Sequence, residues 1–241
     1  VGMNGLLGYG AAHEATHEAD LLILLGTDFP YNDFLPDANV AQVDINGSHI
    51  GRRTKISYPV TGDVAATIEN ILPHVDEKKD RSFLDKMLKK HYGKLEHVVE
   101  AYTSNVDKHT PIHPEYVADL IDRNADEDAI FTVDTGMCNV WGARYITANG
   151  KREQIGSFRH GTMANALPQA LGAQAANPGR QVITFSGDGG LSMLMGELLT
   201  VKLHNLPIKM FVFNNSSLGM VKLEMLVQGL PEHETDHESV N

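Results

Sequence analysis

The sequence predicts an α/β protein with two domains, each built on a parallel, doubly wound sheet, and three observations lead to this prediction. Apolar, β-branched runs alternate with amphipathic stretches along most of the 241 residues, as strands alternate with helices. Polar turns rich in glycine follow several of the apolar runs, where parallel strands are expected to end. A charged, helical stretch at residues 76–112 separates two such alternating regions, residues 1–75 and 113–241.

Composition narrows the class of protein. The chain is 42% hydrophobic and 21% charged, which is ordinary for a globular protein, and its net charge of −11 argues against binding to nucleic acid. Its one cysteine, Cys138, excludes an internal disulfide and fits a cytoplasmic location. The apolar run at residues 21–25 is too short to span a bilayer. Because the sequence begins at Val1 without an initiator methionine, we expect a fragment of a longer protein.

In the first region, a glycine-rich loop at residues 1–10 precedes a short helix at residues 11–19. Strands are predicted at residues 21–26 and 40–45, with a further edge strand at residues 57–63. Asp63 then caps a helix over residues 64–75. Asp44 ends the second strand, where a carboxylate could bind a ribose hydroxyl, although spacing alone favours a simple turn.

The second region alternates more regularly. We predict helices at residues 113–125, 137–146 and 163–176, interleaved with strands at residues 129–134 and 154–158. Cys138 is expected to be a small buried hydrophobe rather than a nucleophile, since no arrangement of histidine and asparagine supports it. The polar tail from residue 231 onward is expected to be floppy, so the pair His233 and His237 is not a site.

The stretch from Gln181 to Gly219 has a strand–turn–helix–strand–turn pattern, with strands at residues 181–186 and 207–213. Its two turns, GDGG and NNSSLG, therefore meet at the carboxyl edge of one sheet. Glycines let backbone N–H groups approach an anion, and a helix starting near Gly190 points its N-terminus there. Asp188 and Asn215 offer the hard oxygen ligands that Mg²⁺ prefers. These features predict a Mg²⁺–diphosphate site, and no Gly-Lys-Ser/Thr follows that would indicate a Walker loop.

GDGG followed by NN resembles the thiamine diphosphate signature of the decarboxylase and oxidase superfamily. Upstream, GSFRHGTMANALPQALGAQAANPGRQV is similar to the cofactor loop and helix of pyruvate oxidases, including the quinone-linked pyruvate dehydrogenases. The segments LLGTDFPYNDF and QVDIN are similar to the FAD-binding middle domain of the same enzymes. These segments occur in the family's order, and the similarity runs from about residue 1 to residue 226.

The resemblance implies that residues 1–75 are the C-terminal part of an FAD-binding middle domain, residues 76–112 a helical linker, and residues 113–241 a thiamine diphosphate-binding domain. The implied contacts to thiamine diphosphate are Gly161, Thr162, Met163, Asp188, Gly189, Gly190, Asn215, Ser216, Ser217, Leu218, Gly219, Met220 and Val221. Of these, Asp188, Asn215 and the backbone carbonyl of Ser217 would hold Mg²⁺. The implied contacts to FAD are Asn4, Gly5, Leu6, Leu7, Thr27, Asp28, Phe29, Pro30, Tyr31 and Asp44.

The activity that the resemblance implies is oxidative decarboxylation of pyruvate, with electrons passing to FAD and then to quinone or O₂. No catalytic residue is expected in this chain, because the family's activating glutamate lies in another domain of a partner subunit. A homo-oligomer, dimer or tetramer, is implied, with peripheral membrane contact only through a segment absent from this sequence. The closest alternative is an acetolactate synthase with the same folds and cofactors, although the wording GTMANALPQALGA favours the oxidase. A non-catalytic nucleotide-binding module is a second alternative.

The motif HEATH, residues 13–17, matches the H-E-x-x-H pattern of zinc hydrolases. No glutamate occurs between Glu18 and Glu69 to supply a nearby third ligand. We therefore expect a surface helix with two incidental histidines and no zinc.

Overall fold

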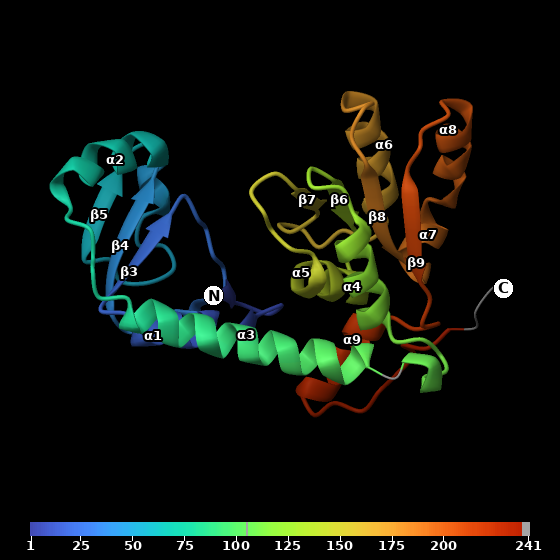
Figure 1. Ribbon diagram of the computed structural model, residues 1–241, viewed down its shortest axis with the longest axis horizontal. Coiled ribbons are helices and arrows are strands. Elements are labelled where there is room, and N and C mark those ends of the chain that lie inside the picture. The colour runs from blue at the N-terminus through green and yellow to red at the C-terminus, as the bar shows by residue number, and fades with distance from the viewer. Residues whose placement is uncertain (105, 238–241) are drawn as a thin grey trace. The chain divides into compact units, whose positions relative to one another are not determined.

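The computed structural model describes residues 1–104 and 106–237, and the chain divides into two compact units, residues 1–100 and 101–241. Each unit contains a parallel sheet with helices, as Figure 1 shows, so the predicted α/β class is confirmed. The boundary between the units falls inside the stretch that the sequence marks as a linker.

The first unit is built on a three-stranded parallel sheet in the order β3-β4-β5. Its elements are β1 (Gly2–Met3), β2 (Tyr9–Gly10), α1 (Ala12–Glu18), β3 (Leu21–Leu25), β4 (Asn39–Asp44), β5 (Tyr58–Thr61), α2 (Val64–Ile71) and most of α3 (Ser82–Thr103). Where the sequence predicts a plain loop, β1 and β2 form a short antiparallel ladder. Asp63 caps α2 as predicted, because its Oδ1 accepts the backbone N–H of Ala66 at 2.9 Å.

The edge strand β3 is apolar on both of its faces. Leu21, Ile23 and Leu25 point to one face and are 42%, 55% and 44% exposed, while the alternate residues are half-buried. Such a continuous apolar run is typical of parallel strands that are covered on both sides.

Helix α3 begins six residues later than the charged stretch that predicts it, and its N-terminal part packs on α1. Lys86 and Lys90 form ion pairs with Glu18, and Nζ of Lys94 lies 2.6 Å from Glu14. Met87, on the same helix, is 1% exposed. The charged helix α3 can therefore pack on α1, because its buried methionine faces inward while the neighbouring lysines extend over α1 to the glutamates.

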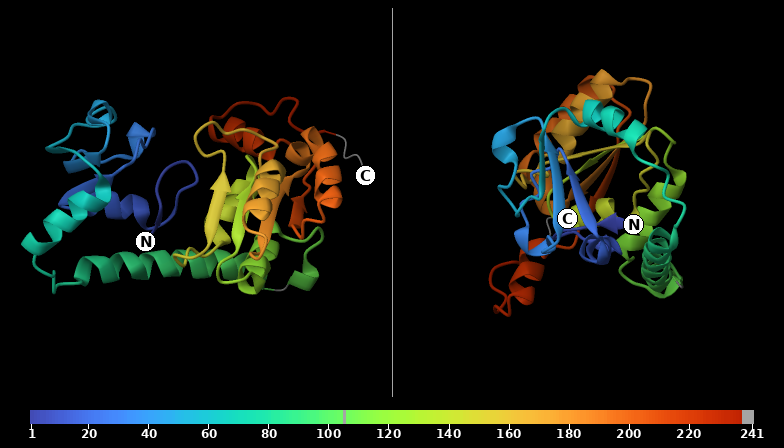
Figure 2. Two further views of the ribbon diagram at one scale, coloured as in Figure 1. Left: turned by 90° about the horizontal axis from the view of Figure 1, so that it is seen from above. Right: turned by 90° about the vertical axis from the view of Figure 1, so that its left-hand side faces the viewer.

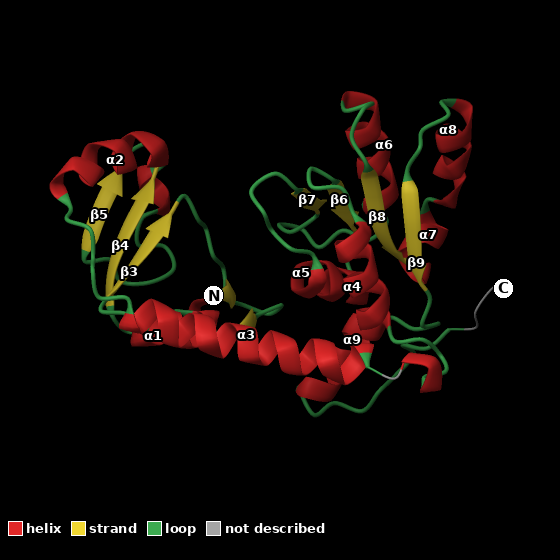
Figure 3. Ribbon diagram, in the orientation of Figure 1, coloured by secondary structure: helices red, strands yellow, loops and turns green. Residues whose placement is uncertain are grey.

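The second unit contains a four-stranded parallel sheet in the order β7-β6-β8-β9, drawn in yellow in Figure 3. Its elements are α4 (Pro114–Asn124), β6 (Ile130–Val133), α5 (Met137–Tyr145), β7 (Glu153–Gly156), α6 (Ala166–Ala176), β8 (Val182–Gly187), α7 (Asp188–Met193), α8 (Leu198–Leu203), β9 (Lys209–Phe213) and α9 (Gly219–Val227). Single 3₁₀ turns occur in both units at Asn32–Phe34, Gly47–His49, Leu72–His74, Val106–Lys108 and Met195–Glu197. The predicted helix after GDGG is therefore two helices joined by a 3₁₀ turn, and α6 starts three residues later than predicted.

The strand order creates a reversal at the centre of this sheet. The chain runs from β6 to its neighbour β7 at one edge of the sheet. It then crosses back over β6 to form β8 and, beyond it, β9. The left view of Figure 2 shows these strands side by side. Right-handed crossovers in opposite directions place α5 and α6 on opposite faces, and both helices contact β6 and β8. The carboxyl ends of β6 and β8 therefore form a topological switch point, the usual binding position in open α/β sheets.

The core of the second unit lies around β6 and β8, which are buried along almost their whole length. Phe185 is 1% exposed, and its ring makes edge contacts with the rings of Phe131, Phe211 and Phe213 at 6.1, 6.3 and 5.2 Å. On the α6 side, Ile130, Ala170, Ala173 and Val182 form a further apolar cluster.

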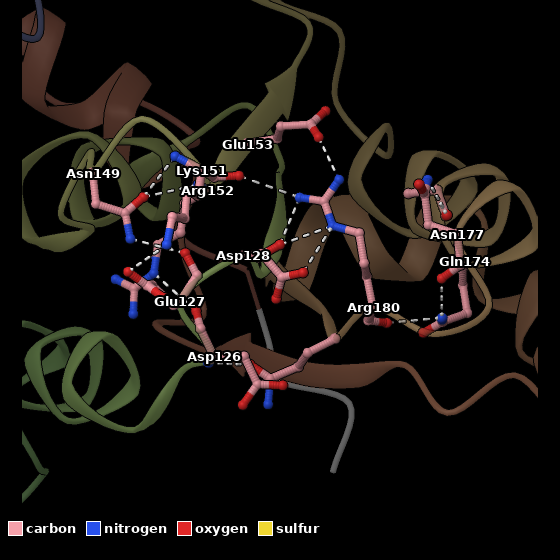
Figure 4. Close-up of polar contacts among 12 residues, drawn as sticks. Asp126, Glu127, Asp128, Asn149, Lys151, Arg152, Glu153, Gln174, Asn177 and Arg180 are labelled. Atoms are coloured by element: carbon pink, nitrogen blue, oxygen red, sulfur yellow. Dashed lines mark hydrogen bonds and ion pairs between the residues drawn. The ribbon is translucent and has the colours of Figure 1, made fainter.

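Two arginines hold segments together at the opposite, amino edge of this sheet, as Figure 4 shows. Arg180 donates to the backbone carbonyl of Asp128 at 2.9 Å and to the carboxylate of Glu153 at 2.5 Å. The guanidinium of Arg152 lies 2.6 Å from the carboxylate of Asp122, and this pair is 11% and 16% exposed. The buried pair therefore locks α4 to the start of β7.

Replacing Arg152 with methionine is expected to destabilise the second unit by about 2–3 kcal/mol, because the largely buried carboxylate of Asp122 would lose its cation and keep only the two hydrogen bonds from Thr147. Urea unfolding should measure this loss. The matched control is Lys151→Ala, whose ion pair with Glu127 is 59% and 72% exposed. That variant should lose less than about 1 kcal/mol. Equal effects of the two substitutions would contradict the role given to the buried pair.

Candidate functional site

The structure brings the two predicted turns together at the carboxyl edge of the second sheet. Asp188 follows β8 and opens α7, and its Oδ2 accepts the backbone N–H of Ser216 at 3.1 Å. Ser216 adopts a positive φ of 52°, which turns the loop after β9 toward that carboxylate. The side-chain oxygen of Asn215 accepts the N–H of Ser217 at 3.2 Å. A carboxylate, an amide oxygen and a short polar loop thus meet where the sequence places them.

The loop before α6 reaches the same place from the other side. Gly161 has a φ of 60°, and Met163 extends toward α7. A Cβ atom added to Gly189 would lie 3.5 Å from Cε of Met163 and 3.9 Å from Cδ2 of Leu218. Apolar side chains from two loops therefore flank the GDGG turn.

A polar segment, residues 232–237, closes over the loop after β9, and we call it the closing strap. The N–H of Leu218 donates to the carbonyl of Thr235 at 2.8 Å, and the N–H of His237 donates to the carbonyl of Ser216 at 3.0 Å. Thr235 is buried, and Nε2 of His237 lies 3.6 Å from Oδ2 of Asp188. The expectation of a floppy tail is therefore wrong as far as residue 237, and residues 238–241 lie outside the described part of the chain.

Asp134, which follows β6, is a site residue that sequence reasoning missed. It is 1% exposed, and its Oδ1 accepts the backbone N–H groups of Thr135 and Asn165 at 3.0 and 3.1 Å and the side-chain amide of Asn165 at 3.0 Å. Burial raises the pKa of the Asp134 carboxyl, and these N–H groups oppose that rise. The sequence does contain a signal for this residue, because Asp134 is a polar residue at the end of a predicted strand, where parallel sheets bind ligands.

Cys138, in the first turn of α5, is buried, as predicted. Its Sγ donates to the backbone carbonyl of Asp134 at 3.2 Å. Burial, with a smaller contribution from the Asp134 carboxylate, raises the pKa of this thiol to about 12. A thiol with that pKa supplies almost no thiolate at neutral pH, so it is unsuited to act as a nucleophile.

In the first unit, two of the stretches assigned to FAD lie together. A Cβ on Gly5 would lie 3.2 Å from the ring of Phe29 and 3.3 Å from the ring of Tyr31, and the two rings contact edge to face at 5.5 Å. The side-chain amide of Asn4 donates to the carbonyl of Phe34 at 3.0 Å. Glycine at position 5 leaves room for the aromatic pair beside the loop.

The two assigned carboxylates lie at the ends of neighbouring strands, since Asp28 follows β3 and Asp44 is the last residue of β4, and both have partners within the unit. The side chain of Arg53 donates to Asp28 at 3.0 Å, and this bond, with the charges of both Arg53 and Arg52, lowers the pKa of Asp28. Asp44 is 5% exposed and accepts the N–H of Asn46 at 2.8 Å. Its other oxygen lies 3.3 Å from Nδ1 of His49. Asp44 thus forms the strand-end turn that spacing alone favours.

The histidines of HEATH lie side by side on one face of α1, with ring centroids 4.1 Å apart and the rings tilted by 42°. Nδ1 of His17 lies 2.9 Å from the carbonyl of His13. Within residues 1–104 and 106–237, no group of three or more histidine, cysteine or acidic side chains is arranged to hold a metal ion. No helix in this part of the chain is both long enough and apolar enough to cross a membrane.

Comparison with known proteins decides the family. Residues 1–71 match the central domain of thiamine pyrophosphate enzymes, and residues 134–240 match their C-terminal thiamine pyrophosphate-binding domain. The chain belongs to the thiamine pyrophosphate enzymes. Thiamine pyrophosphate is the same cofactor as thiamine diphosphate. The resemblance seen in the sequence is therefore correct at the level of the superfamily, and its narrower assignment to pyruvate oxidases is not what the comparisons support.

Relatives of this thiamine pyrophosphate enzyme include proteins with a named activity. The chain is 35% identical, over its whole length, to a Bacillus subtilis protein provisionally named thiamine pyrophosphate-containing protein YdaP. It is 33% identical to the acetolactate synthase of Mycobacterium bovis and 32% identical to the acetolactate synthase large subunit of Lactococcus lactis, each over 92% of the chain. The chain spans only 42%, 37% and 39% of the lengths of these relatives.

The residues of this thiamine pyrophosphate enzyme fit a magnesium diphosphate. Asp188, Asn215 and the backbone carbonyl of Ser217 would supply an all-oxygen donor set, of the kind that Mg²⁺ takes together with phosphate oxygens. Asp188 and Asn215 both bond to the loop of Ser216 and Ser217. Glycines at positions 187, 189 and 190 add no side chains of their own beside the N–H groups there. The assignments of individual contacts, including Thr162, Met220 and the 46%-exposed Val221, remain predictions.

Proposed function

We propose that the full-length protein is a thiamine diphosphate- and Mg²⁺-dependent carboligase of the acetolactate synthase type that acts on pyruvate. The observation that carries the proposal is the contact of Asp188 with the loop of Asn215 to Ser217, at the switch point of a domain of the thiamine pyrophosphate enzymes. The names of the relatives support carboligation over oxidation.

In this proposal the chain binds and orients the cofactor. Asp188, Asn215 and the carbonyl of Ser217 hold Mg²⁺, and the N–H groups of the GDGG turn face the diphosphate. Met163 would contact the aminopyrimidine ring of the cofactor, and Val221 would support its thiazolium ring. Bound thiamine diphosphate supplies an electron sink for the carbanion that a 2-oxo acid leaves on losing CO₂.

A pyruvate oxidase is the second candidate, favoured by the wording of residues 161–173 in the sequence. In that case bound FAD would supply a two-electron carrier, with quinone or O₂ as the final acceptor. Both candidates place FAD in the first unit, over Asn4 to Leu7, Thr27 to Tyr31 and Asp44. For either one we propose a homo-oligomer, because the activating glutamate would come from a partner subunit. A cytoplasmic location is proposed from the single cysteine.

The products of pyruvate distinguish the two candidates. With thiamine diphosphate and Mg²⁺, the full-length protein should form one acetolactate and one CO₂ from two pyruvate molecules, at a rate that added quinone or O₂ does not change. Colorimetric measurement of acetolactate, alongside CO₂ release and acceptor reduction, checks this. Release of CO₂ that requires an acceptor and yields acetate or acetyl phosphate would establish the oxidase instead. Tight cofactor binding without turnover of any 2-oxo acid would favour a non-catalytic module.

Flavin content tests the role of the first unit. The purified full-length protein should be yellow, with about one FAD per chain, because both candidate families use the flavin-binding middle domain. Gly5→Val should lower that content, since a larger side chain would press on the ring of Phe29. The Asp188→Ala variant should retain the flavin, because the predicted flavin contacts lie in the first unit and Asp188 lies in the second. A colourless preparation with full activity would refute the FAD assignment.

A further inference from the structure

We propose that Asp134 is a positioning residue that fixes the Met163 loop and the first turn of α7 relative to each other, and so sets the geometry of the thiamine diphosphate site. The proposal rests on the proposed function of that site. Asp134 follows β6, on the other side of the switch point from Asp188.

Asp134 first fixes the loop before α6 through hydrogen bonds to Asn165. Oδ1 of Asp134 accepts both the backbone N–H of Asn165, at 3.1 Å, and its side-chain amide, at 3.0 Å. The same amide donates to the carbonyl of Thr162 at 2.6 Å, which closes the loop around Met163. Ala164, inside the loop, has a φ of 63°, a conformation that residues other than glycine rarely adopt. The loop therefore holds an uncommon shape, and the bonds to Asp134 maintain it.

Asp134 also contacts α7. A Cβ added to Gly190 would overlap Oδ2 of Asp134, so the carboxylate lies directly against the backbone of the helix. The overlap could not be relieved by a simple swing of the carboxylate, because Oδ1 is held by three N–H donors. Gly190 is two residues after Asp188 on the same turn. The position of Asp134 thus limits how closely this turn can approach β6.

A single buried side chain therefore touches the two segments that carry the predicted contacts to the two ends of the cofactor. Met163 lies on one segment and Asp188 on the other, and Met163 already reaches the GDGG turn at Gly189. Burying a carboxylate is costly unless hydrogen bonds satisfy it. Supporting groups of this kind typically change ligand affinity by about 10–100-fold when removed.

The test is thiamine diphosphate affinity, measured by calorimetric titration at saturating Mg²⁺ on the full-length protein. Asp134→Leu should weaken binding by at least about 10-fold, because Asn165 loses the carboxylate oxygen that accepts its backbone N–H and its side-chain amide. Asp134→Asn keeps one acceptor oxygen in place and should recover part of the affinity. Gly190→Ala should weaken binding in the wild-type background but add little to Asp134→Ala, since the overlapping carboxylate is then gone.

The matched control is Gln174→Leu at the other end of the same sheet. Gln174 is 1% exposed, and its amide donates to the carbonyls of Asn177 and Arg180, both at 3.1 Å. The Gln174→Leu variant should lower the midpoint of thermal unfolding, as Asp134→Leu does, and should leave thiamine diphosphate affinity unchanged. The proposal is overturned if Asp134→Leu also keeps wild-type affinity, or if the effects of Gly190→Ala and Asp134→Ala simply add. Absence of thiamine diphosphate binding by the wild-type protein would instead remove the proposed function and this proposal with it.

Discussion

Replacing Asp188 with alanine should lower the affinity of the full-length protein for thiamine diphosphate by about 100-fold or more. Removal of an outer-shell partner of a metal site already costs about 10–100-fold, and Asp188 is the one charged side chain among the predicted Mg²⁺ ligands. The N–H groups at the start of α7 cannot compensate, since each such interaction contributes only about 0.3–1 kcal/mol. Activity should fall together with cofactor affinity.

Titration of thiamine diphosphate at several Mg²⁺ concentrations checks this result. High concentrations of both should rescue Asp188→Ala in part, and Asn215→Ala should show a weaker form of the same defect because a neutral ligand is lost. Asp63→Ala is a matched control: Asp63 also follows a strand and caps a helix, but in the first unit. It should leave cofactor affinity unchanged. If Asp188→Ala bound thiamine diphosphate with wild-type affinity, the GDGG turn would serve only to connect β8 to α7.

Replacing Phe185 with alanine should destabilise the second unit by about 3–5 kcal/mol, the usual cost of deleting a large buried aromatic side chain. Phe185 lies at the centre of the sheet and contacts three other phenylalanine rings, so neighbouring side chains cannot fill the cavity easily. Thermal and urea unfolding of the second unit should both shift. Phe158→Ala removes the same side chain from a position that is 60% exposed, and it should shift neither by much. Similar losses at both positions would show that Phe185 is not central to the core.

Much of the second unit could be predicted because its strands carry strong local signals. The runs that become β8 and β9 are apolar and end in turns, and parallel pairing necessarily brings those turns to one edge. The contact between Asp188 and the loop of Ser216 follows from that geometry. Boundaries were less accurate, as in the stretch after GDGG, where α7 and α8 are separate helices joined by a 3₁₀ turn.

Features formed by distant residues could not be predicted in the same way. Asp134 and Asn165 are 31 positions apart, and no periodicity links a strand-end aspartate to a loop asparagine. The closing strap is polar throughout, and its order comes from backbone hydrogen bonds to Ser216 and Leu218 and from the burial of Thr235. Likewise β1 and β2 have two residues each, too few for an alternating pattern.

The exposed apolar face of β3 has a practical consequence for preparing this chain by itself. Leu21, Ile23 and Leu25 line one face of an edge strand, where unpaired backbone groups also invite another strand. Sulfate and phosphate salts strengthen association between such surfaces. Purification of the isolated chain by ammonium sulfate, or its crystallisation from phosphate, would therefore select for aggregates, whereas buffers with weakly hydrated anions would keep more of it dispersed.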